Sequence, residues 1–381
     1  MTHEWKKVRL GEVLRHIKEP VALNPEATYA QVTIRMYGKG VVKRGDVVGS
    51  EVGSKQYVAR SNQFIISRID ARNGAFGLVP EELEGAIVTS DFLLFDCDER
   101  LSPDYLRFYS STPDFTAACR NASEGTTNRV RLQVNKFLAA EIPLPPLATQ
   151  RRLVARLQAV QAQVTQVQAV RARQAQEMGA LARAAFREAT HGAPRRPLAE
   201  VAPITRRPVQ VSQTDTYPEL GIRSFGRGTF HKPAVPGSEV GTKKLYYVAP
   251  GDVLFSNVFA WEGAIAVVQP ADAGRVGSHR FISCVCNPAL AVPEFVAFYF
   301  LTPEGLAQVN AASPGGAGRN KTLGLEKLER LQIPLPPLAV QQQFVALQAH
   351  LTALRTAHAA TAAELAQVLP SVLGEVFGGG G

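Results

Sequence analysis

Two long stretches of the chain carry apolar residues at alternating spacings of four and three. In the first, from about Leu147 to Thr190, these positions are Leu153, Leu157, Val160, Val164, Val167, Met178, Leu181 and Ala185, with polar Arg171 and Gln174 between them. In the second, from about Leu338 to Phe377, they are Phe344, Leu347, Leu351, Leu354, Leu365, Val368 and Val372, with His358 and Thr361 between them. A sustained spacing of 3.5 residues predicts coiled-coil helices, each about 60 Å long.

Apolar seams this narrow need a partner, and we predict that the two helices pair antiparallel within the chain. The polar residues in the middle of each seam would fix the register of the pair. Alternatively, each helix packs separately on a domain of its own. The positions expected to hold the coiled coil or to dock a partner protein are Leu153, Leu157, Val160, Val164, Leu347, Leu351, Leu354 and Leu365.

Shorter apolar runs broken by glycine precede each predicted helix. Gln63 to Ser67 and Asp252 to Ser256 are rich in β-branched and aromatic residues and predict strands. Helical patterns appear near Asp104 to Ser110 and Glu294 to Leu301. We therefore predict an α+β chain with mixed α/β domains over residues 1–146 and 193–337, long helices over 147–192 and 338–377, and a flexible glycine tail over 378–381.

The chain repeats itself at about half its length. The sequence Ile-Pro-Leu-Pro-Pro-Leu-Ala-Thr-Gln at Ile142 to Gln150 is echoed by Ile-Pro-Leu-Pro-Pro-Leu-Ala-Val-Gln at Ile333 to Gln341. Shorter pairs keep the same order, namely Leu10 to Val13 with Leu198 to Val201, Ile34-Arg35 with Ile222-Arg223, Gly38-Lys39-Gly40 with Gly226-Arg227-Gly228, and Thr112-Pro113 with Thr302-Pro303. This conserved order indicates a tandem duplication. Antiparallel helices would relate the two copies by a pseudo-twofold axis and place the two domains at opposite ends of the helical pair.

Composition excludes several classes of protein. With 381 residues, 45% of them hydrophobic, the chain can bury a sizeable core, so disorder throughout is excluded. It holds no apolar run of about 18 residues and does not begin with an apolar leader, so we expect a soluble, cytoplasmic protein that does not contact a membrane. Its four cysteines are too few and too oddly spaced for a disulfide framework or a zinc site.

The charge favours a polyanionic partner. Forty-two Lys and Arg residues stand against 33 Asp and Glu residues, which gives a net charge of +9. Such an excess is typical of proteins that bind nucleic acid, although solvated basic surfaces are also common.

Motifs for catalysis are not found. Gly315 to Thr322 comes closest to a phosphate-binding loop, but Asn320 stands where that loop needs glycine. The sequence has no His-Glu-x-x-His, no Gly-x-Ser-x-Gly and no Asn-Pro-Pro-aromatic run, and its seven histidines are scattered. We therefore expect no catalytic residues, no metal site and no cofactor in this chain.

The doubled proline motif, each copy followed by a long Ala- and Gln-rich helix, resembles the DNA specificity subunit of type I restriction-modification systems. The segments Glu124 to Leu132 and Gly315 to Leu323 are also similar to the Gly-Thr/Ala-x-x-x-x-Leu segment of that family. One departure is visible, since Thr149 and Val340 stand where family members usually carry Glu.

The resemblance implies a non-catalytic subunit with two target-recognition domains, each reading one half of an asymmetric, bipartite site in double-stranded DNA. It also implies that the helices dock two adenine-N6 methyltransferase subunits, and with them two restriction and translocation subunits where the system restricts DNA. S-adenosylmethionine, ATP and Mg²⁺ would then belong to those partners. The alternative is a coiled-coil DNA-binding adaptor of another phage-defence complex. A nuclease or NTPase site hidden in a mixed domain is the least favoured reading.

Candidate DNA contacts are the polar and basic residues of glycine-rich loops. Lys and Arg bind phosphates, whereas Arg, Lys, Asn and Gln also read base edges. In the first domain the candidates are Lys39, Lys43, Arg44, Arg68, Arg72, Asn73, Asn128, Arg129 and Arg131. In the second domain they are Arg227, His231, Lys232, Lys243, Lys244, Asn257, Arg280, Arg319, Asn320 and Lys321.

Overall fold

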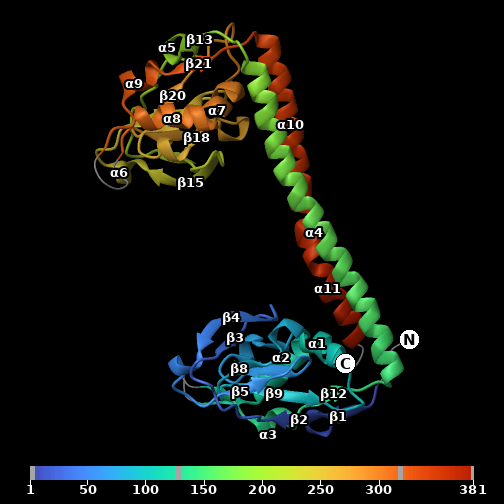
Figure 1. Cartoon of the computed structure of the whole chain (residues 1–381). Coiled ribbons are helices and arrows are strands. Elements are labelled where there is room, and N and C mark those ends of the chain that lie inside the picture. Colours follow the sequence, from blue (N-terminus) through green and yellow to red (C-terminus); the bar gives the residue numbers. More distant parts are fainter. Residues whose placement is uncertain (1–4, 126–129, 316–320, 379–381) are drawn as a thin grey trace. The chain divides into compact units, whose positions relative to one another are not determined.

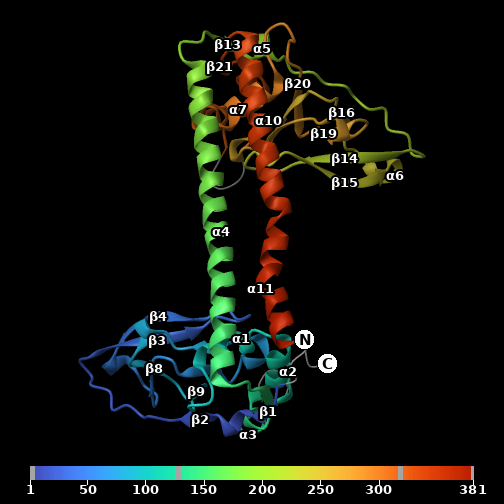
Figure 2. The same cartoon turned by 90° about the vertical axis from the view of Figure 1, so that its right-hand side faces the viewer.

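The computed structural model describes residues 5–125, 130–315 and 321–378. The chain forms two compact units (Figures 1 and 2). Unit 1 consists of Met1–Arg171 together with Ala359–Gly381, and unit 2 consists of Ala172–His358. Each unit combines a mixed α/β domain with segments of the long helices.

Unit 1 contains two four-stranded sheets, in the orders β4-β3-β8-β5 and β2-β9-β6-β7. Its strands are β1 (Lys7–Arg9), β2 (Leu14–Ile17), β3 (Thr28–Ile34), β4 (Val41–Val48), β5 (Tyr57–Ala59), β6 (Phe64–Ser67), β7 (Phe76–Leu78), β8 (Ala86–Val88), β9 (Phe92–Cys97), β10 (Ser123–Glu124), β11 (Arg131–Leu132) and β12 (Glu141–Pro143). Its helices are η1 (Leu10–Glu12), η2 (Gly49–Glu51), η3 (Ala71–Asn73), η4 (Glu81–Leu83), α1 (Pro103–Ser110), α2 (Pro113–Asn121), α3 (Val134–Leu138), the first part of α4 (Leu147–Thr190), and α11 (Ala362–Phe377).

Unit 2 repeats this plan with a four-stranded sheet, β15-β14-β19-β16, and a three-stranded sheet, β18-β17-β20. Its strands are β13 (Arg195–Pro197), β14 (Thr216–Ile222), β15 (Thr229–Pro236), β16 (Leu245–Tyr247), β17 (Val253–Ser256), β18 (Ile265–Val267), β19 (Val276–Ser278), β20 (Phe281–Cys284) and β21 (Gln332–Pro334). Its helices are the rest of α4, α5 (Leu198–Val201), α6 (Gly237–Val240), η5 (Ala260–Glu262), η6 (Pro270–Asp272), α7 (Pro293–Leu301), α8 (Pro303–Ala311), α9 (Leu325–Glu329) and α10 (Leu338–Ala360).

The predicted strands at β6 and β17 and the predicted helices at α1 and α7 are confirmed. The repeated Thr-Pro pairs begin helices α2 and α8. In each, proline occupies the first turn, and the threonine hydroxyl accepts a hydrogen bond from a backbone N–H, that of Phe115 after Thr112 and that of Gly305 after Thr302. Proline is favoured there because the first N–H groups of a helix have no partner within it.

The repeated proline motif joins each domain to its long helix. β12 and β21, which open the two copies of the motif, pair antiparallel with β1 and β13. The glutamine that ends each copy is fully buried, Gln150 in unit 1 and Gln341 in unit 2. Each side chain makes three hydrogen bonds to backbone groups, so the motif is a structural joint in both repeats.

Long helices lie antiparallel within each unit. In unit 1, Val154 and Leu157 of α4 are buried in the same cluster as Leu373 of α11. In unit 2, Met178 and Ala182 of α4 form a buried cluster with Leu351 of α10. These clusters also contain residues of the adjoining domain, so the helices pack both on each other and on their own domain.

Several predictions about the helices are wrong in detail. Leu354 and Leu181, both assigned to the seam, are 51% and 50% exposed. The predicted Met178 is buried, but the next buried positions in α4 are Ala182 and Phe186, spaced by four, because α7 packs against the same stripe through Phe298. The second long helix is also not continuous, since α10 ends at Ala360 and α11 begins at Ala362.

Two further seam positions, Val167 and Val368, are also exposed, at 38% and 39%. The positions expected to hold the coiled coil are otherwise less exposed. Leu157 and Leu351 are buried, while Leu153, Val160, Val164, Leu347 and Leu365 are half-buried. A helix pair without a domain packed on it covers only part of each apolar side chain, so seam positions outside the two buried clusters stay partly exposed. α11 further contains Pro370, which has no N–H to donate within the helix.

Candidate nucleic-acid interface

Each unit ends its four-stranded sheet with a hairpin, β3–β4 in unit 1 and β14–β15 in unit 2. The two hairpin loops, Arg35–Gly40 and Arg223–Gly228, have the same backbone conformation. Both have positive φ at their third, fourth and sixth residues, with 62°, 66° and 88° in the first loop and 63°, 64° and 75° in the second. In both, the first N–H of the loop donates to the carbonyl of the last residue over 2.9 Å.

The tips of the hairpins are fastened to the turns η3 and η5 by backbone hydrogen bonds. Tyr37 N–H donates to the Asn73 carbonyl (2.8 Å) and Gly38 N–H to the Gly74 carbonyl (3.0 Å). In unit 2, Phe225 N–H donates to the Glu262 carbonyl (2.8 Å) and Gly226 N–H to the Gly263 carbonyl (2.9 Å). The two tips are therefore held in the same way although their side chains differ.

Glycine is required beneath each tip. Gly74 and Gly263 both have φ of +76°, a conformation that glycine adopts without strain. A Cβ atom at Gly74 would lie 3.2 Å from the Cα of Tyr37, and one at Gly263 would lie 3.4 Å from the Cα of Phe225. The turn and the tip thus approach each other more closely than most side chains permit.

A β-bulge exposes an extra cation on each hairpin. Gln31 pairs with Gly45 and Val32 with Lys43, so Arg44 is the additional residue in β4. In β15, Lys232 lies in the corresponding irregular stretch between the pairs Pro218–Ala234 and Leu220–His231. Bulges bend a strand and redirect its side chains, and both cations are exposed.

A second set of loops meets at the ends of β6 and β17, where Arg68 and Asn257 follow directly. Arg68 N–H donates to the Asp91 carbonyl (2.7 Å), and the Arg68 carbonyl accepts from Leu132 N–H (2.8 Å). Asn257 makes the matching bonds, donating to the Arg280 carbonyl (2.6 Å) and accepting from Leu323 N–H (2.8 Å). Leu132 and Leu323 are the buried leucines that end the two segments Glu124–Leu132 and Gly315–Leu323.

Arg68 and Asn257 share another property. Nε of Arg68 and Oδ1 of Asn257 are buried and have no hydrogen-bond partner among the described residues. Buried polar atoms are nearly always hydrogen-bonded, so equivalent places in the two repeats each hold a polar atom whose partner is not among the described residues.

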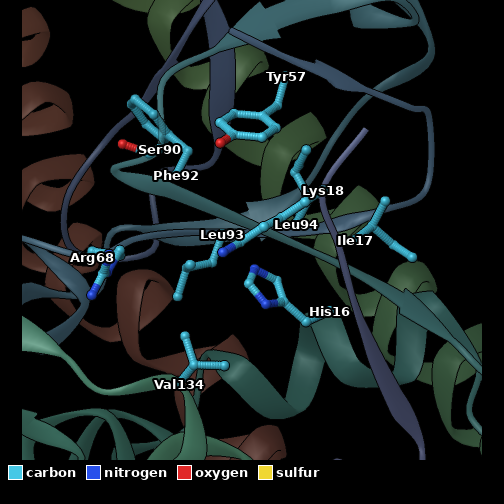
Figure 3. Close-up of a pocket in the computed structure, with 10 residues that line it drawn as sticks. All are labelled: His16, Ile17, Lys18, Tyr57, Arg68, Ser90, Phe92, Leu93, Leu94 and Val134. Carbon is cyan, nitrogen blue, oxygen red and sulfur yellow. The ribbon is translucent and has the colours of Figure 1, made fainter. Parts of the chain in front are cut away.

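Arg68 also lines a cavity of about 180 Å³ in unit 1, with His16, Lys18, Tyr57 and Phe92 among the surrounding residues (Figure 3). Burial lowers the pKa of His16 below 6.5, and the charges of Lys18 and Arg68 lower it further. The imidazole is therefore neutral at neutral pH, and the two cations give the cavity a positive charge. A cavity of this kind suits an anionic group or a hydrogen-bond acceptor.

Several predicted DNA contacts in unit 1 lie on these connected loops. Lys39 is on the hairpin tip, Arg72 and Asn73 are in η3, and Arg68 follows β6. Two of the predicted cations are paired with carboxylates, Arg131 with Asp91 at 3.1 Å and Lys43 with Asp46 at 2.7 Å. The free charge of this surface therefore comes mainly from Lys39, Arg44 and Arg72.

In unit 2 the pairing is more extensive. His231 bonds to the buried Asp272 at 2.9 Å, and Lys232 lies 3.9 Å from Glu219. Burial raises the pKa of Asp272, but hydrogen bonds from the Gln269 N–H, Thr229 and His231 outweigh that effect and lower it. The His231 ring thus helps to hold the hairpin.

Three further lysines of unit 2 were predicted to contact DNA. Lys321 donates to Asn310 (2.7 Å) and lies over the ring of Trp261, 4.9 Å from its centroid. Lys243 and Lys244 precede β16, which lies at the opposite edge of the sheet from β15. The Lys244 carbonyl accepts from His279 N–H, which places it beside Arg280 and the Asn257 loop, away from the hairpin. Four predicted contacts, two in each unit, lie outside the described residues, namely Asn128, Arg129, Arg319 and Asn320.

Four residues of the hairpin loops were not predicted from the sequence. Arg35 and Arg223 are exposed cations at the first loop position, and Tyr37 and Phe225 are exposed aromatic residues at the third. The repeat contained the signal, because Ile-Arg and Gly-Lys/Arg-Gly match on either side of an aromatic residue in both copies. A prediction based on charge alone does not include the aromatic residue between these two matching segments.

None of the helices in the described part of the chain is both long and apolar enough to cross a membrane. No group of three or more His, Cys, Asp or Glu residues there could hold a metal ion. All four cysteines are free thiols, and burial raises the pKa of Cys119 to about 12.

Comparisons with known proteins bear on the whole chain. The family model for the type I restriction modification DNA specificity domain matches residues 2–172 and again residues 195–367. A search of curated proteins finds no match.

Two solved structures are similar over nearly the full length. A crystal structure of the HsdS subunit from Thermoanaerobacter tengcongensis is 25% identical, with 98% of this chain and 96% of that chain covered and a TM-score of 0.61. A structure that concerns complex assembly and conformational transition of the type I R-M system is also 25% identical, with 98% and 97% covered and a TM-score of 0.70. The family model matches most of the chain as two copies of one domain, and both solved structures are similar over nearly its full length. The chain therefore belongs to the family of type I restriction-modification DNA specificity subunits.

Proposed function

We propose that this chain reads an asymmetric, bipartite target in double-stranded DNA, with one half-site for each unit, and that it is itself not an enzyme. The observation that carries the proposal is that both units hold the same loop frame with different side chains. Arg68 and Asn257 occupy equivalent places, as do Lys43 and His231. Arginine favours guanine and asparagine favours adenine in the major groove, so unlike side chains predict unlike half-sites.

Exposed cations of the hairpins would bind the phosphates on either side of the bases. Lys39 and Arg44 in unit 1, and Arg227 and Lys232 in unit 2, lie on the same surface as the loops that would contact bases. Phosphate contacts of this kind fix the register of a protein on the duplex and make its affinity depend on salt.

The proposal extends to partner proteins. We infer that the helices dock two adenine-N6 methyltransferase subunits, and two restriction and translocation subunits where the system cleaves DNA. Exposed apolar side chains on α4, among them Val167 (38% exposed) and Val170 (46% exposed), support such docking. S-adenosylmethionine, ATP and Mg²⁺ would be bound by those partners, which the chain would meet in the cytoplasm.

The proposal is tested by mapping N6-methyladenine across the genome in cells with and without the gene. We expect methylation at a split consensus with a fixed gap, which disappears when the gene is removed. Arg68→Ala should alter one half of the consensus and Asn257→Ala the other half. Methylation that does not depend on the gene, or a complex without any consensus, would refute the reading and favour a phage-defence adaptor.

A further inference from the structure

Two aromatic side chains stand out from the surface of the molecule. Tyr37 is 74% exposed and Phe225 is 73% exposed, and no other large apolar side chain in the described ranges is as exposed as these two. They occupy the same position, the third residue of the hairpin loop, in the two repeats. An exposed ring at one place could be incidental, but the same exposure at equivalent places of two diverged repeats needs an explanation.

The backbone at these positions disfavours an aromatic residue. Both residues have positive φ, 62° for Tyr37 and 63° for Phe225, a conformation that is costly for bulky side chains and easy for glycine. The backbone bonds to the turns η3 and η5 hold this conformation and would do so equally well with glycine in place of the ring. The ring buries little apolar surface and its position adds strain, so it contributes little to folding, and strain of this kind is typical of functional positions.

The charges around the rings identify the partner. Along each loop the ring has an exposed cation two residues before it and another two residues after it, Arg35 and Lys39 in unit 1 and Arg223 and Arg227 in unit 2. Arg227 lies over the Phe225 ring, 5.5 Å from its centroid. An exposed ring on a loop that also carries two exposed cations fits DNA, in which apolar base faces lie between phosphates, and apolar wedges at base steps are a known means of binding it. Met36, beside Tyr37, is also exposed (42%), but Ser224 takes its place beside Phe225, so the two repeats share the ring and its cations and not an apolar patch of the kind that docks a protein.

We propose that Tyr37 and Phe225 are equivalent DNA wedges. Each ring inserts at a base step within the half-site that its own unit contacts, while the neighbouring cations bind the phosphates beside that step. Partial unstacking at this step would make each half-site depend on how easily its sequence is deformed, in addition to direct base contacts. This inference rests on the proposed function.

The test uses the full chain and glycine substitutions. Tyr37→Gly and Phe225→Gly remove the ring but keep the backbone conformation, so the thermal midpoint should equal or exceed that of the wild type. Sequences bound by the wild type are first selected from a library of random DNA duplexes. On the selected consensus, each glycine variant should bind about tenfold more weakly, whereas Tyr37→Trp and Phe225→Tyr should bind as the wild type does. Tyr247→Ala is the matched control, because Tyr247 is also exposed (47%) but lies outside the hairpin.

Insertion is read out with 2-aminopurine placed at successive positions of the consensus. Wild-type protein should raise its fluorescence at one step in each half-site, and each glycine variant should lose the signal in one half only. Glycine variants that bind and unstack DNA as the wild type does would overturn the inference. The same holds if they keep DNA binding but no longer retain the co-expressed methyltransferase. Failure to select any consensus with the wild type would instead refute the proposed function.

Discussion

The backbone N–H of Ser102 donates a hydrogen bond of 2.9 Å to Oε1 of Gln150, which joins the start of helix α1 to the first turn of α4. Nε2 of Gln150 donates to the carbonyls of Arg100 (2.7 Å) and Pro145 (2.8 Å). In unit 2, Gln341 makes the same three bonds to Val292, Leu290 and Pro336. The last residue of the repeated proline motif therefore holds the junction between domain and helix in both units.

Gln150→Ala should destabilise unit 1 by about 3 kcal/mol, because it leaves three backbone groups without a partner in a buried place. Gln341→Ala should do the same in unit 2. Urea denaturation followed by circular dichroism measures both effects. Thr149→Ala, at the half-buried neighbour, is the control and should unfold close to the wild type. A Gln150→Ala midpoint within error of that control would contradict the assigned role.

Gly74→Ala should destabilise the protein more than Gly85→Ala does. Both glycines have nearly the same φ, +76° and +78°, so both substitutions carry the strain of an alanine at positive φ. Only at Gly74 would the new Cβ also crowd Tyr37, since no atom lies within 4 Å of a Cβ at Gly85. The difference between the two midpoints in urea isolates the contact with the hairpin tip, and we expect it to be about 1 kcal/mol. Equal midpoints would show that the tip is loosely held.

His16 should make the stability depend on pH. Its pKa is lowered in the folded protein, first by burial and then by Lys18 and Arg68. Between the folded and unfolded pKa values the folded state binds fewer protons, so stability present above about pH 6.5 is lost as the pH falls further. His16→Gln should flatten this part of the pH profile in thermal denaturation. His191→Gln, at an exposed histidine, is the control. If the thermal midpoint of the wild type did not decrease as the pH is lowered from 6.5, this would argue against a neutral His16.

Arg156 and Glu375 should contribute little to the pairing of α4 and α11. Their ion pair, 3.0 Å between Nη2 and Oε2, is largely exposed to solvent. A double-mutant cycle with alanine should give less than about 1 kcal/mol, whereas Leu157→Ala, at a fully buried side chain, should cost about 2–5 kcal/mol. A coupling energy in the cycle as large as the Leu157 effect would reverse this ranking.

Sequence patterns predicted the elements better than the way they pack. The spacing of four and three located the long helices, and the doubled Ile-Pro-Leu-Pro-Pro-Leu motif located the repeat. The pattern placed Leu354 in the seam because periodicity records which positions are apolar, not what covers them. Only the packing of α7 on α4 and α10 determines which apolar positions are buried.

The candidate site was predicted in part for a similar reason. Glycines and cations of the hairpin loops are visible in the sequence, so Lys39, Arg44 and Arg227 could be named. The ion pair of another predicted cation, Arg131, could not be foreseen, because its partner Asp91 is 40 residues away in the sequence and the two side chains meet only in the folded domain. The repeat shows that an aromatic residue recurs at Tyr37 and Phe225, but the positive φ and the exposure of these residues are visible only in the structure.

The hairpin tips are held by bonds between main-chain atoms, and this has a consequence for how such a protein can change over time. Substitutions of Lys39, Arg44 or Arg227 leave every one of those bonds in place, so under the proposed function they would alter what the surface recognises at little cost to folding. New DNA sequence preferences would therefore arise by single substitutions on this surface. Each repeat could do so without regard to the other, so diversity would arise as combinations of independently drifting halves.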